Sequence, residues 1–219
     1  MKTLLIYGSG GQGKEIVDLA RYIDKRNERW NDVCFIDDFA GGAFAYNCRV
    51  MDFEKARELQ SQKETECIIA LGEPALRRKL FDKCRQAGLK TASLISPAAI
   101  VSDTAVIGEG VIVSHNVFVS SNCRIENNVL LQPMCSVAHD SVIGEHSVIS
   151  TFAAIAGNCT VGAGSYIGLS AAVREKVTIG GGSILGMGAI AVNDIPDAVI
   201  AVGVPARPVR SNENKKVFK

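Results

Sequence analysis

The stretch that decides the fold begins AIVSDT AVIGEG VIVSHN at residue 99 and continues in units of six to AIAVND, which ends at residue 194. In fifteen of these sixteen units the third residue is Val, Ile or Leu, and the exception is Ala191. The first residue is always Ala, Val, Cys or Ser. A helix repeats about every 3.6 residues and cannot produce a strict period of six.

Short strands joined by corners explain the period. In an extended segment side chains alternate in direction, so the first and third residues of a unit share one side and the second points to the other. Positions four to six are rich in Gly, Asn, Asp, Glu and Ser, which favour turns. We therefore predict a parallel β-helix over residues 99–194, whose stacked coils enclose the aliphatic third residues.

Residues 1–98 predict a different fold. They carry 16 Lys/Arg and 14 Asp/Glu, whereas residues 99–194 carry only 3 and 7. An alternation of buried strands and amphipathic helices predicts a Rossmann-like βαβαβ domain with a parallel sheet. The strands are expected at 3–7, 33–36 and 67–71, and the helices at 14–23, 54–62 and 74–86. Residues 195–219, with 5 basic and 2 acidic residues, form a C-terminal extension.

The composition argues against several classes of protein. A net charge of +1 over 219 residues offers no basic field for nucleic acid or an anionic membrane. The apolar run Leu4–Tyr7 is too short for a signal peptide, and no later stretch approaches a membrane span. Seven cysteines, odd in number and without a CxxC pair, are typical of reduced thiols, so we expect a cytoplasmic protein.

A glycine motif follows the first predicted strand. Gly8, Gly10 and Gly13 fit G-x-G-x-x-G at the start of a helix, where backbone N–H groups can approach a phosphate. A dinucleotide site usually needs two βαβαβ halves, and only one precedes the repeats. We therefore expect one nucleotide, with its pyrophosphate at the glycine turn and its base or ribose near Asp37 and Asp38. Alternatively, the glycines allow a tight turn and Asp38 caps a loop.

Several motifs together resemble one family. They are YGSGGQGKE at 7–15, FIDD at 35–38, the uninterrupted hexads, HDSVIGEH at 139–146 and VGVPAR at 202–207. The combination resembles the bacterial sugar acetyltransferases of the hexapeptide-repeat superfamily, which include UDP-4-amino-sugar N-acetyltransferases and the sialic-acid O-acetyltransferase type. The resemblance implies a left-handed β-helix of triangular section with three hexads per coil. It also implies a homotrimer with sites between subunits, and acetyl-CoA as co-substrate without a metal.

The resemblance also implies two sets of binding residues. For the nucleotide sugar, besides Gly8 in the turn, it places Gly10, Gly11 and Gln12 at the sugar, Asp37 and Asp38 at the uracil, and Gly72 close by. The family commonly has His where this chain has Gln12. For acetyl-CoA it places Leu169 and Met187 on an apolar wall beside Gly168 and Gly186, with Arg207 and Arg210 available to the CoA phosphates. Val148 falls where some amino-sugar enzymes carry a second histidine near the acetyl group.

Only three histidines, at 115, 139 and 146, are available as a general base. His139 lies at a corner of its hexad and is followed by Asp140, whose carboxylate can orient an imidazole and raise its basicity. With 18 residues per coil, Gly157 lies above His139, where its N–H is expected to donate to an oxyanion. Alternatively, Gly157 is a corner glycine with a positive φ. His115 and His146 are expected at the surface or an interface, and no spacing indicates a metal site.

Two further expectations concern surfaces. Arg77, Arg78 and Lys79 are expected on a solvated helix face. The second residues of the hexads point outward and many are apolar, which favours self-association; they include Val106, Ile112, Phe118, Leu130, Val142 and Val148.

Three functions are open at this point. The first is acetyl transfer to the 4-amino group of a UDP-linked amino sugar, by direct attack on acetyl-CoA with His139 as base. The second is O-acetylation of sialic acid or another sugar by the same base. The third is a non-catalytic trimer that serves as a nucleotide-sugar-binding scaffold.

Overall fold

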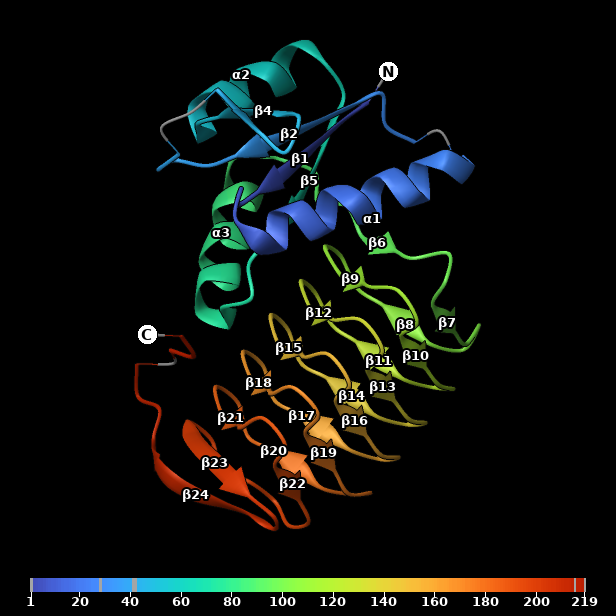
Figure 1. Cartoon of the computed structure of the whole chain (residues 1–219), viewed down its shortest axis with the longest axis vertical. Helices are drawn as coiled ribbons and strands as arrows, with labels where there is room; N and C mark the ends of the chain where they lie inside the picture. Colours follow the sequence, from blue (N-terminus) through green and yellow to red (C-terminus); the bar gives the residue numbers. More distant parts are fainter. Residues whose placement is uncertain (1, 28, 41–42, 215, 219) are drawn as a thin grey trace.

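The computed structural model describes residues 2–27, 29–40, 43–214 and 216–218. An α/β domain lies at one end and is followed by a long triangular coil of short strands (Figure 1). A strand hairpin caps the far end of the coil, and the last residues run back toward the α/β domain (Figure 1).

The N-terminal domain has a five-stranded sheet in the order β3-β4-β2-β1-β5. All neighbours pair in parallel except β3 and β4. Every residue of β1, an interior strand of the sheet, is buried. The strands are β1 (Thr3–Tyr7), β2 (Asp32–Ile36), β3 (Phe44–Ala45), β4 (Cys48–Met51) and β5 (Thr65–Ile69). The three predicted strands are therefore present, and β3 and β4 are an addition that the sequence did not indicate.

The three helices agree with the predicted ones. They are α1 (Gly11–Asn27), α2 (Phe53–Gln62) and α3 (Pro74–Gln86). Asp52 caps α2 by accepting a hydrogen bond from the Lys55 N–H, and Pro74 opens α3, where a missing N–H costs nothing. The bounds of two helices differ from the prediction. α1 starts three residues earlier, at Gly11 inside the glycine motif, and ends four residues later, at Asn27, while α2 starts one residue earlier, at Phe53.

Residues 99–194 form the parallel β-helix that the hexads predict, and it is left-handed, as the resemblance implies. Every hexad contributes one two-residue strand, made of its second and third residues, and each strand pairs in parallel with the strand 18 residues away. The sixteen strands are β7 (Ile100–Val101), β8 (Val106–Ile107), β9 (Ile112–Val113), β10 (Phe118–Val119), β11 (Arg124–Ile125), β12 (Leu130–Leu131), β13 (Ser136–Val137), β14 (Val142–Ile143), β15 (Val148–Ile149), β16 (Ala154–Ile155), β17 (Thr160–Val161), β18 (Tyr166–Ile167), β19 (Ala172–Val173), β20 (Thr178–Ile179), β21 (Ile184–Leu185) and β22 (Ile190–Ala191).

The strands form the three walls of the prism. The first wall runs β7-β10-β13-β16-β19-β22 and the second runs β8-β11-β14-β17-β20. The third contains β9-β12-β15-β18-β21 and is extended by β6 (Leu94–Ile95) at one end and by the hairpin β23 (Val199–Gly203) and β24 (Ala206–Ser211) at the other. The stacking thus begins with β6, a few residues before the first hexad.

The side chains of the first and third residues of each hexad point into the prism, which explains the residue types found at these two positions. The third residues are aliphatic and form one continuous buried cluster. The first residues are small because each lies close to the neighbouring coil. Where the first residue is serine, its buried hydroxyl donates to a carbonyl on the next coil, as Ser141 does to Ala156 O at 3.0 Å and Ser165 to Gly180 O at 2.9 Å. Buried hydroxyls are thereby satisfied.

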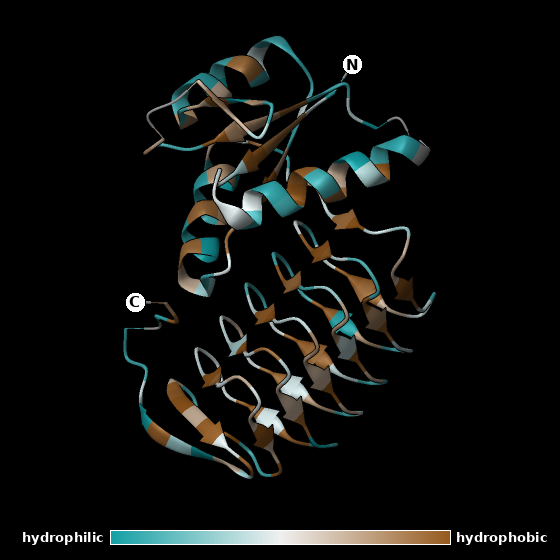
Figure 2. Cartoon of the chain, in the orientation of Figure 1, coloured by the Kyte–Doolittle hydropathy of each residue, from teal (hydrophilic) through white to brown (hydrophobic). Residues whose placement is uncertain are grey.

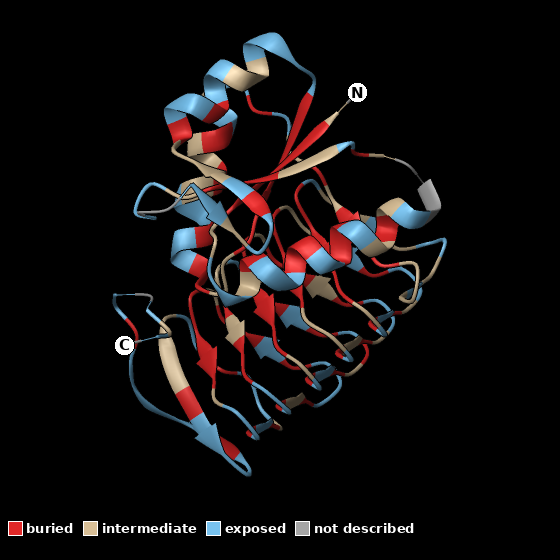
Figure 3. Ribbon diagram, turned by 45° about the horizontal axis from the view of Figure 1, so that its top comes forward, coloured by how far each residue is buried: buried red, intermediate tan, exposed pale blue. Residues whose placement is uncertain are grey.

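The third wall is covered by the N-terminal domain, and this corrects one prediction. Ile112, Leu130 and Val148 point outward from the prism but are fully buried, because they pack in one cluster with residues of β1 and α1. Figure 2 shows the hydrophobic strands of the prism facing the sheet domain, and Figure 3 shows these strands as buried. The expectation that these three residues favour self-association was wrong. Val106 and Phe118, on the other two walls, remain exposed.

Candidate active site

The glycine turn connects β1 to α1 and leaves the first N–H groups of the helix open. Gly8 has a φ of 109°, which only glycine adopts readily. A Cβ on Gly13 would lie 2.1 Å from the Gly8 carbonyl oxygen, so only glycine lets the helix approach the turn this closely. A Cβ on Gly10 or Gly11 would meet nothing within 4 Å. The turn therefore has open space beside a helix N-terminus, where an anion is favoured.

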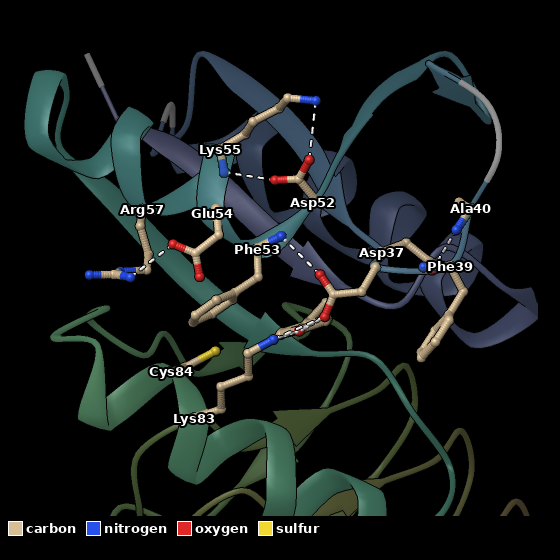
Figure 4. Close-up of polar contacts among 12 residues, drawn as sticks. Asp37, Phe39, Ala40, Asp52, Phe53, Glu54, Lys55, Arg57, Lys83 and Cys84 are labelled. Atoms are coloured by element: carbon tan, nitrogen blue, oxygen red, sulfur yellow. Dashed lines mark hydrogen bonds and ion pairs between the residues drawn. The ribbon is translucent and has the colours of Figure 1, made fainter.

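Asp37 shapes this turn. Its Oδ2 accepts hydrogen bonds from the N–H and hydroxyl of Ser9. Its Oδ1 accepts from the N–H groups of Phe39 and Ala40, at 3.0 and 3.1 Å (Figure 4). Partial burial acts to raise the pKa of Asp37, but these hydrogen bonds outweigh it and lower the pKa below the usual value. Four donors fill the acceptor sites of a carboxylate. Asp37 thus joins the end of β2 to the glycine turn.

Asp38 keeps one acceptor site open. Its Oδ2 accepts from the Tyr7 hydroxyl at 2.6 Å and from Lys83 Nζ at 2.9 Å, and its Oδ1 accepts from the Phe53 N–H at 2.9 Å. Figure 4 shows Lys83 reaching from α3 toward these strand ends. Burial acts to raise the pKa of Asp38, but the bonds from Tyr7 and Lys83 lower it, so the carboxylate is ionised at neutral pH. Three donors leave room for one more.

His139 and Asp140 lie together at the corner between the first and second walls. His139 Nδ1 is 2.8 Å from Asp140 Oδ2, and both side chains are about half exposed. The bonds from His139 and then Asn122 lower the pKa of Asp140. Because the ionised carboxylate is an acceptor, it fixes the proton on Nδ1 and leaves Nε2 as the basic nitrogen. The arrangement fits a general base.

Asn122 is a residue of this corner that the sequence analysis missed. It lies one coil below Asp140 and donates from Nδ2 to Asp140 Oδ1 at 3.1 Å. Its own N–H donates to Thr104 Oγ1, two coils below Asp140. Asn122 and Asp140 both have positive φ values, of 57° and 59°, which Asn and Asp tolerate better than most residues. Asn122 therefore orients the carboxylate so that its other oxygen faces the imidazole. The spacing of 18 residues between Asn122 and Asp140 could have predicted this contact from the sequence.

We expect the variant Asn122→Ala to lower kcat/KM about three- to tenfold, because one hydrogen bond to a charged group is lost. The KM for acetyl-CoA is expected to stay the same. The matched control is Asn116→Ala, since Asn116 occupies the same hexad position with a φ of 56° at another corner. Steady-state kinetics of both variants test the role, and equal losses in the two would contradict it.

Gly157 lies directly against His139. A Cβ on Gly157 would be 2.6 Å from Cε1 and 2.7 Å from Nε2 of the imidazole, so any larger residue would displace the ring. Its φ is not positive, which means that the alternative interpretation as a strained corner glycine was wrong. Within the described part of the chain, no hydrogen bond uses the Gly157 N–H. A backbone donor is thus available at the glycine that lies against the imidazole.

The residues expected to bind acetyl-CoA lie in different parts of the structure. Leu169 and Met187 lie on adjacent coils at the corner between the third and first walls, with exposed fractions of 45% and 77%. Gly168 and Gly186 precede them, and a Cβ on either would clash with the next coil. Arg207 and Arg210 are exposed on β24. Val148, in contrast, is fully buried under the N-terminal domain, so its side chain is closed to a ligand.

One expectation about charged residues was wrong. Arg77 is fully buried rather than solvated, and its guanidinium donates to Asn128 on the β-helix, to the carbonyl oxygen at 2.7 Å and to Oδ1 at 2.9 Å. Arg78 and Lys79 are exposed as expected. His146 is also buried, with its Nδ1 3.0 Å from Asn128 Nδ2 and its ring against Phe81. Burial lowers the pKa of His146, so the ring is neutral at neutral pH and accepts from the amide.

The two halves of the expected site lie on different sides of one chain. The N-terminal domain covers the third wall, whereas His139 lies at the corner between the first and second walls, which is the corner opposite the third wall. Within one chain the glycine turn and the imidazole are therefore not brought together. Within the described ranges, three or more His, Cys, Asp or Glu side chains nowhere gather as they would around a metal ion. No described helix is both long and apolar enough to cross a membrane.

A left-handed β-helix that follows an α/β domain with a glycine turn defines the class of hexapeptide-repeat acyltransferases with an N-terminal nucleotide-binding-like domain. The family model of the PglD N-terminal domain matches residues 3–84, and that of the GMPPB C-terminal domain matches residues 89–200. Together with the solved relatives, these matches show that the chain belongs to the acetyl-CoA-dependent sugar N-acetyltransferases of the hexapeptide-repeat superfamily.

Two solved relatives match over nearly their whole length. One is the acetyltransferase domain of PglB from Neisseria gonorrhoeae in complex with acetyl coenzyme A, with 30% identity, a TM-score of 0.88, and coverage of 94% of this chain and 98% of that one. The other is PerB from Caulobacter crescentus in complex with CoA and GDP-perosamine, with 30% identity, a TM-score of 0.85, and coverage of 94% and 97%. WeeI from Acinetobacter baumannii, at 22% identity and a TM-score of 0.71, shares the fold.

Proposed function

We propose that this protein transfers the acetyl group of acetyl-CoA to the amine on C4 of a nucleotide-linked amino sugar, and that the nucleotide is UDP. The observation that carries the proposal is the imidazole of His139, which is held through Nδ1 by Asp140 and whose Cε1–Nε2 edge lies against Gly157. The relatives in complex with acetyl-CoA and with CoA and GDP-perosamine support the two substrate classes.

The reaction is a direct transfer in which the amine attacks the thioester carbonyl. As the N–C bond forms, His139 Nε2 takes a proton from the amine, and the Asp140 carboxylate stabilises the imidazolium. The carbonyl oxygen becomes an oxyanion, to which Gly157 donates its N–H. The C–S bond then breaks, CoA leaves as a thiolate, and the proton passes from the imidazolium to the thiolate or to water. No acyl-enzyme is required.

The site is built from two subunits of a homotrimer. The placement of His139 on the side of the prism away from the N-terminal domain supports a site that is shared between subunits. A neighbouring copy is needed to bring a glycine turn to the imidazole. The exposed apolar residues at the corner between the third and first walls fit both a subunit contact and the pantetheine arm; they are Met134, Phe152, Leu169 and Met187. Arg207 and Arg210 are placed to bind CoA phosphates.

The nucleotide lies across the carboxyl ends of the parallel strands, as ligands of such sheets do. The pyrophosphate binds at Gly8, Gly10, Gly11 and Gln12, and the sugar is close to Gly72. The remaining acceptor site of Asp38 can take an N–H of the base, while Asp37 acts by holding the turn. Uracil and guanine both present such an N–H. A GDP-linked amino sugar is therefore the second candidate, favoured by the ligand of the PerB complex.

A panel assay of CoA thiol release tests the proposal. The purified protein is given acetyl-CoA with UDP-linked 4-amino sugars, GDP-linked 4-amino sugars, or sialic acids. We expect turnover with a nucleotide-linked 4-amino sugar and none with sialic acid. Turnover with sialic acid alone would establish the O-acetyltransferase alternative. Binding of nucleotide sugar without any acetyl-CoA binding in calorimetry would favour the non-catalytic scaffold.

A further inference from the structure

The end of the chain is docked on the N-terminal domain. The buried carboxylate of Glu73, at the start of α3, accepts the Val217 N–H at 3.0 and 3.1 Å and the Phe218 N–H at 3.0 Å. Figure 1 shows the C-terminus beside the nearer end of α3. A carboxylate with charge-assisted bonds to two backbone N–H groups holds this end in a defined position.

The other end of this segment is anchored on the last coil of the β-helix. Asn212 is buried, its N–H donates to Ala198 O at 2.6 Å, and its side-chain amide donates to Gly182 O at 2.9 Å. Its Oδ1 accepts from the Lys216 N–H at 3.2 Å. We name residues 212–214 and 216–218 the C-terminal strap, because both ends are fixed by buried polar groups and the segment crosses from one domain to the other.

The strap places one aromatic ring at the edge of the proposed nucleotide-sugar site. A Cβ on Gly72 would lie 3.6 Å from the Phe218 ring, so the ring is in contact with the loop that follows β5. The edge of the ring packs against Tyr166 of the β-helix, with 5.6 Å between the ring centroids. Phe218 is still 50% exposed. Part of this apolar ring, next to the loop that follows β5, therefore remains exposed.

The order of the strands indicates which part of the ligand would lie next to the Phe218 ring. β2, β1 and β5 are adjacent in that order. With the base beside Asp38 at the end of β2, and the pyrophosphate at the glycine turn after β1, the next group along the ligand lies at the end of β5. That group is the sugar. Gly72 and Phe218 are at this end.

We propose that the C-terminal strap forms the outer wall of the sugar pocket and that Phe218 is a specificity-determining residue, which packs its ring on the apolar C–H face of the hexose. The proposal rests on the proposed function. Glu73 acts through the strap as a positioning residue. The role differs from the one expected for the C-terminal extension, which was a contribution to the CoA site.

The test is the variant Phe218→Ala in the full-length protein, examined by calorimetry. Its ligands are the nucleotide sugar that the wild type acetylates and the matching nucleoside diphosphate. We expect the Kd of the nucleotide sugar to rise roughly three- to tenfold, which corresponds to the loss of one aromatic contact. The Kd of the nucleoside diphosphate and the KM for acetyl-CoA are expected to stay within about twofold. Glu73→Gln, which keeps the shape of the side chain but loses its charge, is expected to change the same Kd in the same direction.

The matched control is Phe44→Ala, because Phe44 is an exposed aromatic residue on β3, at the opposite edge of the same sheet. It should leave both affinities unchanged. The proposed contact between Phe218 and the sugar would be refuted if Phe218→Ala left the affinity for the nucleotide sugar unchanged. It would also be refuted if the variant lost equal affinity for the nucleotide sugar and the nucleoside diphosphate. A wild-type protein that binds neither UDP- nor GDP-linked 4-amino sugars would instead refute the proposed function itself.

Discussion

Replacing His139 with alanine is expected to lower kcat/KM by about 10²- to 10⁴-fold, the range for loss of a general base. The physical reason is that His139, of the three histidines in the sequence, is the one at this corner, and its ring lies against Gly157. Because the His139 side chain is more than half exposed, its removal should cost little stability. The measurement is the rate of CoA thiol release with a saturating nucleotide sugar, together with thermal unfolding of the same preparation.

The matched control is His115→Ala. His115 lies at another corner, where its Nδ1 is 2.8 Å from the Ser96 hydroxyl and its ring packs edge-on against Tyr22. This variant should retain most of the activity, and both variants should bind acetyl-CoA as the wild type does. Full activity of the His139→Ala protein would remove the imidazole from the mechanism.

The second large effect is on stability. In Arg77→Met the buried guanidinium no longer donates to the Asn128 carbonyl and side chain, or to Ile69 O at 2.7 Å and Leu71 O at 3.0 Å. These oxygens stay buried without a donor, and each costs about 1–3 kcal/mol, partly offset because a charge no longer has to be buried. We expect the free energy of unfolding to fall by about 2–4 kcal/mol and Tm to fall by roughly 5–15 °C. Thermal denaturation followed by circular dichroism measures the change.

The neighbouring residue supplies the control for this prediction. Arg78 is on the same helix, is largely exposed, and makes a long contact of 3.9 Å to Asp82. Arg78→Met should change the stability by less than about 0.5 kcal/mol. If the two variants unfolded at the same temperature, Arg77 would not be the residue that joins α3 to the β-helix.

The repeat of six was sufficient to predict the β-helix, because it reports a local alternation that each hexad repeats. The pair His139 and Asp140 was predictable for a similar reason, since the two residues are adjacent in the sequence. The contact of Gly157 with the ring followed from the 18-residue coil. The reason for a glycine at position 157 could not be predicted. The sequence does not distinguish a glycine that is needed for a positive φ from a glycine that leaves room for a neighbouring side chain.

Contacts between distant segments were beyond the sequence analysis. The burial of Arg77 depends on Asn128, 51 residues away, and a helix with three consecutive basic residues is usually a solvated one. Ile112, Leu130 and Val148 are apolar and point outward from the prism, and their pattern does not say whether a second copy or the N-terminal domain covers them. The bond between Glu73 and Phe218 spans 145 residues and has no local signature.

In the proposed reaction, His139 of one subunit acts on an amino sugar held by the N-terminal domain of its neighbour. A crystal structure of the protein with CoA and the nucleotide sugar is the sharpest test of this arrangement. We expect the C4 nitrogen to lie about 2.6–3.2 Å from His139 Nε2 of one subunit, while the pyrophosphate lies at the glycine turn of another. A sugar whose amine lies far from every His139 in the assembly would contradict it.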